Sequence, residues 1–101
     1  MIEDIQATFL HRFTALARSR IANARVAITR RDPVSLGVAA RDMHSIAGEG
    51  GLLGIADVVP IARRAEVSTK QLASDPTGAD EVTATLLELE QLVERLARDR
   101  A

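Results

Sequence analysis

Cysteine, tryptophan and tyrosine are absent from this 101-residue chain, and two phenylalanines are its only aromatic residues. Without cysteine, disulfide bonds and thiolate metal sites are excluded. Phe9 and Phe13 are too few to form a stacking platform for single-stranded nucleic acid. The net charge is −1, from 13 basic and 14 acidic residues, so the chain also lacks the positive charge that attracts DNA or RNA. We therefore expect no nucleic-acid partner.

Several sequence signals for other compartments and ligands are also missing. No run of about 18 apolar residues is present, so we expect no membrane partner. The first residues, MIEDIQATFLHRF, lack a basic segment followed by a long apolar stretch, which predicts no signal peptide and a cytoplasmic protein. His11 and His44 are isolated from each other and from further close ligand pairs, so no metal site is expected. No glycine-rich phosphate loop follows a strand, so no nucleotide cofactor is expected either.

The residues that are present favour helices packed around one core. Hydrophobic residues make up 47% of the chain, and a length of 101 residues suits a single domain, which we expect to span residues 1–101. Alanine, leucine, arginine and glutamate dominate, and these residues favour helix. The prediction is an all-α protein.

Helix boundaries can be read from a few breaks in the sequence. We expect helices over residues 3–31, 33–53, 56–73 and 80–99, with a loop over 74–80. Asp32 reads as an N-cap with Pro33 at the first helical position, and Gly54 reads as a C-cap. The first helix either runs unbroken or divides near residue 12 into a short cap and a bundle helix. Because short connections favour antiparallel neighbours, we expect an up-down-up-down antiparallel four-helix bundle with an extended or capping N-terminal helix.

Apolar residues recur along each expected helix at three- and four-residue steps, as one buried face requires. The positions expected to face the core are Ile2, Ile5, Phe9, Phe13, Leu16, Ala17, Ala24, Ile28, Leu36, Ala39, Met43, Ile46, Gly50, Leu53, Val58, Ile61, Ala62, Ala65, Thr69, Leu72, Val82, Leu86, Leu89, Val93 and Leu96.

The segment RDMHSIAGEGGLLG, residues 41–54, combines a histidine with four of the six glycines. A glycine inside a helix costs about 1 kcal/mol relative to alanine, so these glycines need a reason. Gly50 lies on the expected core stripe, where it would let two helices pack closely. The other small residues lie beside His44 and would form a bare docking surface for an incoming molecule. This docking surface comprises Ala40, Ala47, Gly48 and Gly51.

Residues of the third expected helix lie at the level of His44. If the chain turns at Gly54, residue 64 of the antiparallel helix is opposite His44. Arg63, Arg64 and Glu66 are then within about one helical turn of the imidazole. Arg64 reads as a solvated charge, and Glu66 has two candidate partners, His44 and Lys70 at i+4.

The segment HSIAGEGGLLG, residues 44–54, resembles the signature of histidine-containing phosphotransfer (HPt) domains. That signature typically reads His, two residues, Lys, Gly, two small residues, two residues, a hydrophobic residue and Gly. HSI also resembles the phosphorylated domain of the chemotaxis histidine kinase, and IADVVPIARRAE is similar to the family's next helix. The resemblance covers roughly residues 36–70. The matching positions are His44, Gly48, Gly50, Leu53 and Gly54.

The resemblance implies a histidine phosphocarrier of a bacterial two-component phosphorelay. His44 would accept a phosphoryl group from a receiver-domain phosphoaspartate and pass it to another receiver. The partners would be response-regulator receiver domains and a hybrid histidine kinase, with the metal supplied by the receiver and no kinase activity in this chain. Glu66 would orient the imidazole. The family's lysine is replaced by Ala47, so Arg63 and Arg41 are the candidates to support the phosphoryl group.

Two other interpretations remain open at this point. The chain is alternatively a non-phosphorylated receiver-binding adaptor of the same fold, which the missing lysine at Ala47 favours. It is otherwise a structural helical dimerisation domain, with Ile2, Ile5 and Phe9 as an exposed seam. Glu49, where the family has a small residue, is expected on the solvent face with little effect.

Overall fold

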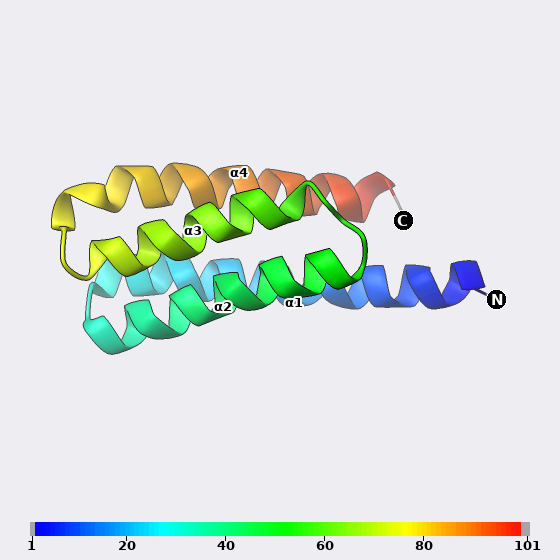
Figure 1. Ribbon diagram of the computed structural model, residues 1–101, viewed down its shortest axis with the longest axis horizontal. Coiled ribbons are helices and arrows are strands. Elements are labelled where there is room, and N and C mark those ends of the chain that lie inside the picture. The colour runs from blue at the N-terminus through cyan, green and yellow to red at the C-terminus, as the bar shows by residue number, and fades with distance from the viewer. Residues whose placement is uncertain (1, 100–101) are drawn as a thin grey trace.

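The computed structural model describes residues 2–99, and side chains from residue 5 onwards. Over this range the chain forms four α-helices and one short 3₁₀ helix: α1 (Ile2–Arg30), α2 (Pro33–Leu52), α3 (Val58–Leu72), η1 (Pro76–Gly78) and α4 (Ala79–Asp99). The helices alternate in direction and pack as an antiparallel bundle (Figure 1), so the predicted all-α four-helix bundle is confirmed. Among the described helices, none is long and apolar enough to cross a membrane.

Helix α1 is continuous, so the alternative of a break near residue 12 is wrong. It has 29 residues, and its N-terminal end extends past the α2–α3 connection (Figure 1). No proline or glycine interrupts this helix, which removes the usual causes of a kink. The first turns of α1 therefore lie beyond the end of α2.

The predicted start of α2 is confirmed in detail. Asp32 is the N-cap, and its side chain accepts a hydrogen bond from the backbone N–H of Ser35 at 2.8 Å. Pro33 occupies the first helical position, where its missing N–H leaves no hydrogen bond unmade. These local contacts turn the chain sharply between α1 and α2.

The end of α2 has the geometry of a Schellman motif. Gly54 has a φ of +73°, a conformation that suits glycine because it has no Cβ. The N–H of Ile55 donates to the carbonyl of Gly50 at 2.8 Å, and the N–H of Gly54 donates to that of Gly51 at 3.2 Å. The prediction of Gly54 at the C-terminal end of this helix is confirmed, immediately after the cap residue Leu53.

Differences from the predicted boundaries are confined to the turns. Helix α3 begins at residue 58 rather than 56, and Asp57 makes no side-chain capping hydrogen bond. The expected loop over 74–80 contains η1, and α4 begins at residue 79. Asp75 starts η1 by accepting a hydrogen bond from the N–H of Thr77 at 3.1 Å.

Most positions predicted to face the core are buried or partly buried, but four are exposed. Ile5, Phe9, Leu16 and Leu53 were expected in the core, and the structure corrects these four predictions. Ile5 and Phe9 lie in the first turns of α1, and Leu53 belongs to the turn after α2. The side chain of Ile2 lies outside the described residues. Buried positions that the pattern missed are Thr14, Ile21, Ala27, Ala40, Ala47, Ser68, Thr85 and Leu92.

Gly50 brings α2 and α3 into close contact, as its place on the core stripe predicted. A Cβ added at Gly50 would lie 2.9 Å from Cγ1 of Val58, a separation that side chains do not tolerate without a shift. A Cβ added at Gly48 would meet no atom within 4 Å. The two glycines therefore have different reasons to be present: packing explains Gly50 but does not explain Gly48.

Substitution of each glycine by alanine is expected to change stability in opposite directions. Gly48→Ala should raise the free energy of unfolding by about 0.5–1 kcal/mol, because alanine favours helix and no clash arises. Gly50→Ala gains the same propensity but overpacks the α2–α3 contact, a cost of about 1–3 kcal/mol. Urea unfolding of both variants measures the difference. Equal stabilisation of the two would show that α2 and α3 separate without cost.

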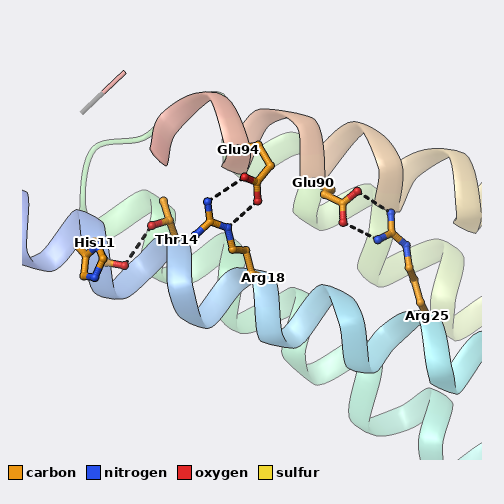
Figure 2. A network of polar contacts seen from close by, with 6 residues as sticks. All are labelled: His11, Thr14, Arg18, Arg25, Glu90 and Glu94. Atoms are coloured by element: carbon orange, nitrogen blue, oxygen red, sulfur yellow. Dashed lines mark hydrogen bonds and ion pairs between the residues drawn. The ribbon is translucent and has the colours of Figure 1, made fainter. Parts of the chain in front are cut away.

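Two arginine–glutamate pairs join α1 to α4 along the outside of the bundle (Figure 2). Arg18 donates to both carboxylate oxygens of Glu94, at 2.6 and 2.8 Å, and Arg25 donates to both oxygens of Glu90. The hydrogen bond from Arg25 holds the pKa of Glu90 below its ordinary value. Exposed ion pairs of this kind add little net stability.

Candidate functional site

The structure brings His44 and Glu66 together across the α2–α3 interface. The Nδ1 atom of His44 lies 3.2 Å from Oε1 of Glu66. The side chain of His44 is 75% exposed, whereas that of Glu66 is only 16% exposed. A partly buried carboxylate thus holds one edge of an imidazole whose other edge faces solvent.

The contact with Glu66 determines which nitrogen of a neutral imidazole is the nucleophile. An ionised carboxylate only accepts hydrogen bonds, so a neutral His44 hydrogen-bonded to it carries its proton on Nδ1. The lone pair is then on Nε2. A hydrogen bond to one ring nitrogen also fixes the ring orientation. The site therefore offers a fixed, outward-facing Nε2.

Glu66 contacts both of the partners that its sequence position suggested. Its Oε1 contacts His44, and its Oε2 accepts a hydrogen bond from Nζ of Lys70 at 3.0 Å. Burial raises the pKa of Glu66, but the hydrogen bonds from Lys70 and His44 outweigh it, and the pKa lies below its ordinary value. Glu66 is therefore ionised at neutral pH.

The register between α2 and α3 places Arg63 at the level of Ala47. Two contacts define this register: His44 with Glu66, and Gly51 with Val59, whose Cγ2 would lie 3.8 Å from a Cβ on that glycine. Because the two helices are antiparallel, each residue further along α2 lies opposite one residue earlier on α3, so Ala47 lies opposite Arg63. The sequence placed residue 64 opposite His44; the structure places residue 66 there, because residues 53–57 are used by the turn.

Half of the predicted docking surface is not at the surface. Ala40 and Ala47 are only 2% and 4% exposed, so the prediction that they form a docking surface is wrong. They lie on the inward side of α2, where small side chains allow neighbouring helices to approach. Gly48 and Gly51 are exposed beside His44. The bare surface next to the imidazole is therefore made by these two glycines.

Arg41 and Arg63 are exposed, and neither makes a hydrogen bond or an ion pair with any residue between 5 and 99. Arg41 lies three residues before His44 on α2, and Arg63 lies three residues before Glu66 on α3, so each shares a helical face with a site residue. Arg64 donates instead to Glu88 of α4, with both distances at 3.0 Å. Only the first two have guanidinium groups free to meet an anion at His44.

Three features of this region were missed or misplaced from the sequence. Leu52 is exposed on α2, one turn beyond Gly48, and adds an apolar side chain to the same surface. Glu49, expected on the solvent face, forms an ion pair with Arg20 of α1 at 2.8 Å. The spacing offered Lys70 as an alternative to His44 as the partner of Glu66, whereas the structure shows both contacts together.

Among the residues that the structure describes, no group of three or more histidine, aspartate or glutamate side chains is arranged to hold a metal ion. No family model matches the chain, and neither a curated protein nor a solved structure matches it. Function is therefore inferred from the His44 region itself.

Proposed function

We propose that the protein is a histidine phosphocarrier of a bacterial two-component phosphorelay. His44 accepts a phosphoryl group from a phosphoaspartate of a receiver domain and passes it to an aspartate of another receiver. The observation that carries this proposal is the exposed imidazole whose Nδ1 is held by the partly buried Glu66. The resemblance of residues 44–54 to HPt domains supports it.

The chemistry requires only a nucleophile, charge balance and access. The Nε2 lone pair of His44 attacks phosphorus in line, the nitrogen–phosphorus bond forms, and the phosphorus–oxygen bond to the aspartate breaks. Aspartate leaves as a carboxylate, and the proton on Nδ1 stays between His44 and Glu66. The phosphorylated ring then carries a positive charge that the carboxylate of Glu66 stabilises. Phosphoryl transfer depends mainly on positioning and electrostatic stabilisation, so a plain helical bundle can perform it.

The receiver supplies what this chain does not. We expect the receiver to hold the divalent metal ion and the acidic cluster around its aspartate. The exposed Gly48 and Gly51 leave room for such a partner to reach Nε2. The sequence has no ATP-binding element, so we expect the phosphoryl group to arrive from a receiver and no kinase activity in this chain.

Arg63 is expected to interact with the phosphoryl group in place of the family's lysine. It is at the level of Ala47, the position where that lysine occurs, and its guanidinium is unpaired within residues 5–99. Because the contact would be solvent-exposed, its effect is modest, about 1 kcal/mol or less. Arg63→Ala should shift the transfer equilibrium a few-fold towards the receiver, and the shift should shrink at high salt.

Arg64→Ala is the matched control for this prediction. Arg64 has the same charge and lies one residue away, but it pairs with Glu88 on the α4 side. The measurement is the phosphotransfer equilibrium constant for the wild type and both variants against one receiver. Identical equilibrium constants for the wild type and Arg63→Ala would show that Arg63 does not interact with the phosphoryl group.

The experiment that tests the proposed function is incubation with a panel of phosphorylated receivers. Transfer of phosphate to the chain within seconds to minutes from at least one receiver is the expected result. Receiver binding without transfer would identify a non-phosphorylated adaptor and overturn the carrier proposal. Stable phosphoreceivers and no binding across the panel would also contradict it.

A second candidate function is a helical dimerisation domain. The observation in its favour is the exposure of Ile5 and Phe9 in the first turns of α1. The N-terminal end of this helix extends past the α2–α3 connection (Figure 1). A concentration-independent dimer in analytical ultracentrifugation, with no phosphate acquired from any receiver, would favour this function over the carrier.

A further inference from the structure

Three charged or polar side chains form a continuous chain of hydrogen bonds at the site. Lys70 Nζ lies 3.0 Å from Oε2 of Glu66, and Oε1 of Glu66 lies 3.2 Å from Nδ1 of His44. Both carboxylate oxygens are therefore occupied, one by a fixed positive charge and one by the imidazole. The lysine is 64% exposed and reaches back over one helical turn of α3 to the much less exposed carboxylate.

We infer that Lys70 is a positioning residue that acts through Glu66 to hold His44 in the tautomer with Nδ1 protonated. A glutamate side chain has three rotatable bonds, and with only one oxygen bound its carboxylate can turn away from the ring. The ammonium group of Lys70 fixes the second oxygen, so the first stays directed at Nδ1. The effect of Lys70 on phosphotransfer rests on the proposed function, whereas its effect on the tautomer of His44 does not.

The arrangement of the other cations makes Lys70 specific to this role. Arg64 is also on α3 and also pairs with a glutamate, but its partner is Glu88 of α4, away from the imidazole. Arg63 makes no polar contact with the described part of the chain. Lys70 is the sole lysine of the sequence, and its position four residues after Glu66 is the favourable order for such a pair.

A merely structural ion pair and a positioning residue have different consequences. An i, i+4 pair that only supports the helix would change stability slightly when removed and leave the imidazole unchanged. A positioning residue changes the ratio of the two neutral tautomers. This ratio is read directly from the ¹⁵N chemical shifts of the two ring nitrogens of His44, at a pH where the ring is neutral.

The test compares Lys70→Met, Lys70→Arg and Arg64→Met with the wild type. The wild type and Arg64→Met should show mainly the Nδ1–H tautomer. Lys70→Met should lower the ratio of Nδ1–H to Nε2–H by about threefold, a modest change because the pair is exposed. Lys70→Arg should restore most of the ratio, since arginine also donates to a carboxylate. An unchanged ratio in Lys70→Met, or an equal loss in Arg64→Met, would overturn the inference.

Transfer kinetics separate this inference from the proposed function. With a receiver that phosphorylates the wild type, Lys70→Met should lower the transfer rate at saturating receiver in proportion to the fraction of His44 that remains in the Nδ1–H tautomer, with little change in receiver affinity. A shifted tautomer ratio in a protein that no receiver phosphorylates would support the positioning role and contradict the phosphocarrier. Normal transfer by the wild type with an unchanged tautomer ratio in Lys70→Met would support the phosphocarrier and contradict the positioning role of Lys70.

Discussion

His44→Gln is expected to abolish phosphorylation by a phosphorylated receiver while leaving the fold intact. The side chain of His44 is 75% exposed, and its Nδ1 is hydrogen-bonded to Glu66. Substitutions at such surface positions usually change stability by less than about 0.5 kcal/mol. Glutamine keeps a polar side chain of similar length but has no ring nitrogen to attack phosphorus. Labelling with radioactive phosphate and circular dichroism measure the two expectations.

His11→Gln provides the control for this experiment. His11 is also exposed on a helix, but none of the carboxylates described between residues 5 and 99 contacts its imidazole; its backbone carbonyl accepts a hydrogen bond from Thr14 at 3.1 Å (Figure 2). This variant should be labelled as fully as the wild type. The phosphate should be labile in acid and stable in alkali, as a nitrogen–phosphorus bond is. Label that persists in His44→Gln, or that resists acid, would place the phosphorylation elsewhere.

Gly48→Leu is expected to stabilise the protein and yet slow phosphotransfer by about tenfold or more, equivalent to at least about 1.4 kcal/mol of lost transition-state stabilisation. No atom lies within 4 Å of a Cβ at this position, and leucine has a higher helix propensity than glycine by several tenths of a kcal/mol. The slower transfer has a steric cause, because Gly48 lies one turn from His44 and a leucine would project where the receiver approaches. Thermal unfolding measures the stability, and time courses of phosphotransfer measure the rate.

Gly37→Leu separates access from helix propensity. Gly37 lies on the same helix, seven residues before His44, and a Cβ there also meets no atom within 4 Å. This variant should gain similar stability and transfer phosphate at the wild-type rate. Equal rates for Gly48→Leu and the wild type would show that the open surface at Gly48 has no role in docking.

The sequence alone determined the parts of the structure that local interactions control. Asp32 followed by Pro33 starts α2 through contacts within a few residues, and Gly54 ends it because glycine adopts a positive φ readily. The 3.6-residue periodicity predicted four helices and most of their buried faces. His44 and Glu66 lie on either side of one short connection between helices. Because antiparallel helices joined by a tight connection have little freedom in register, the sequence also brought these two residues to neighbouring levels.

Tertiary structure decided which apolar and small side chains are covered. Periodicity assigns Ile5 and Phe9 to the apolar face of α1, but burial also requires a neighbour that covers each side chain, and both remain exposed. For Ala40 and Ala47 the opposite holds: their side chains are small enough to fit either at the surface or between helices, and only the packing of α2 in the bundle places them inside.

Tertiary structure likewise decided how the charges are shared at the site. The sequence offered Glu66 two partners, and nothing in the spacing shows that its two oxygens serve both His44 and Lys70 at once. The same limit applies to Arg64 and Arg63, which are adjacent in sequence: Arg64 donates to Glu88 of α4, whereas Arg63 is exposed. Hydrogen bonds between helices depend on rotation of each helix about its axis, which local sequence preferences leave undetermined and the packing of the common core sets.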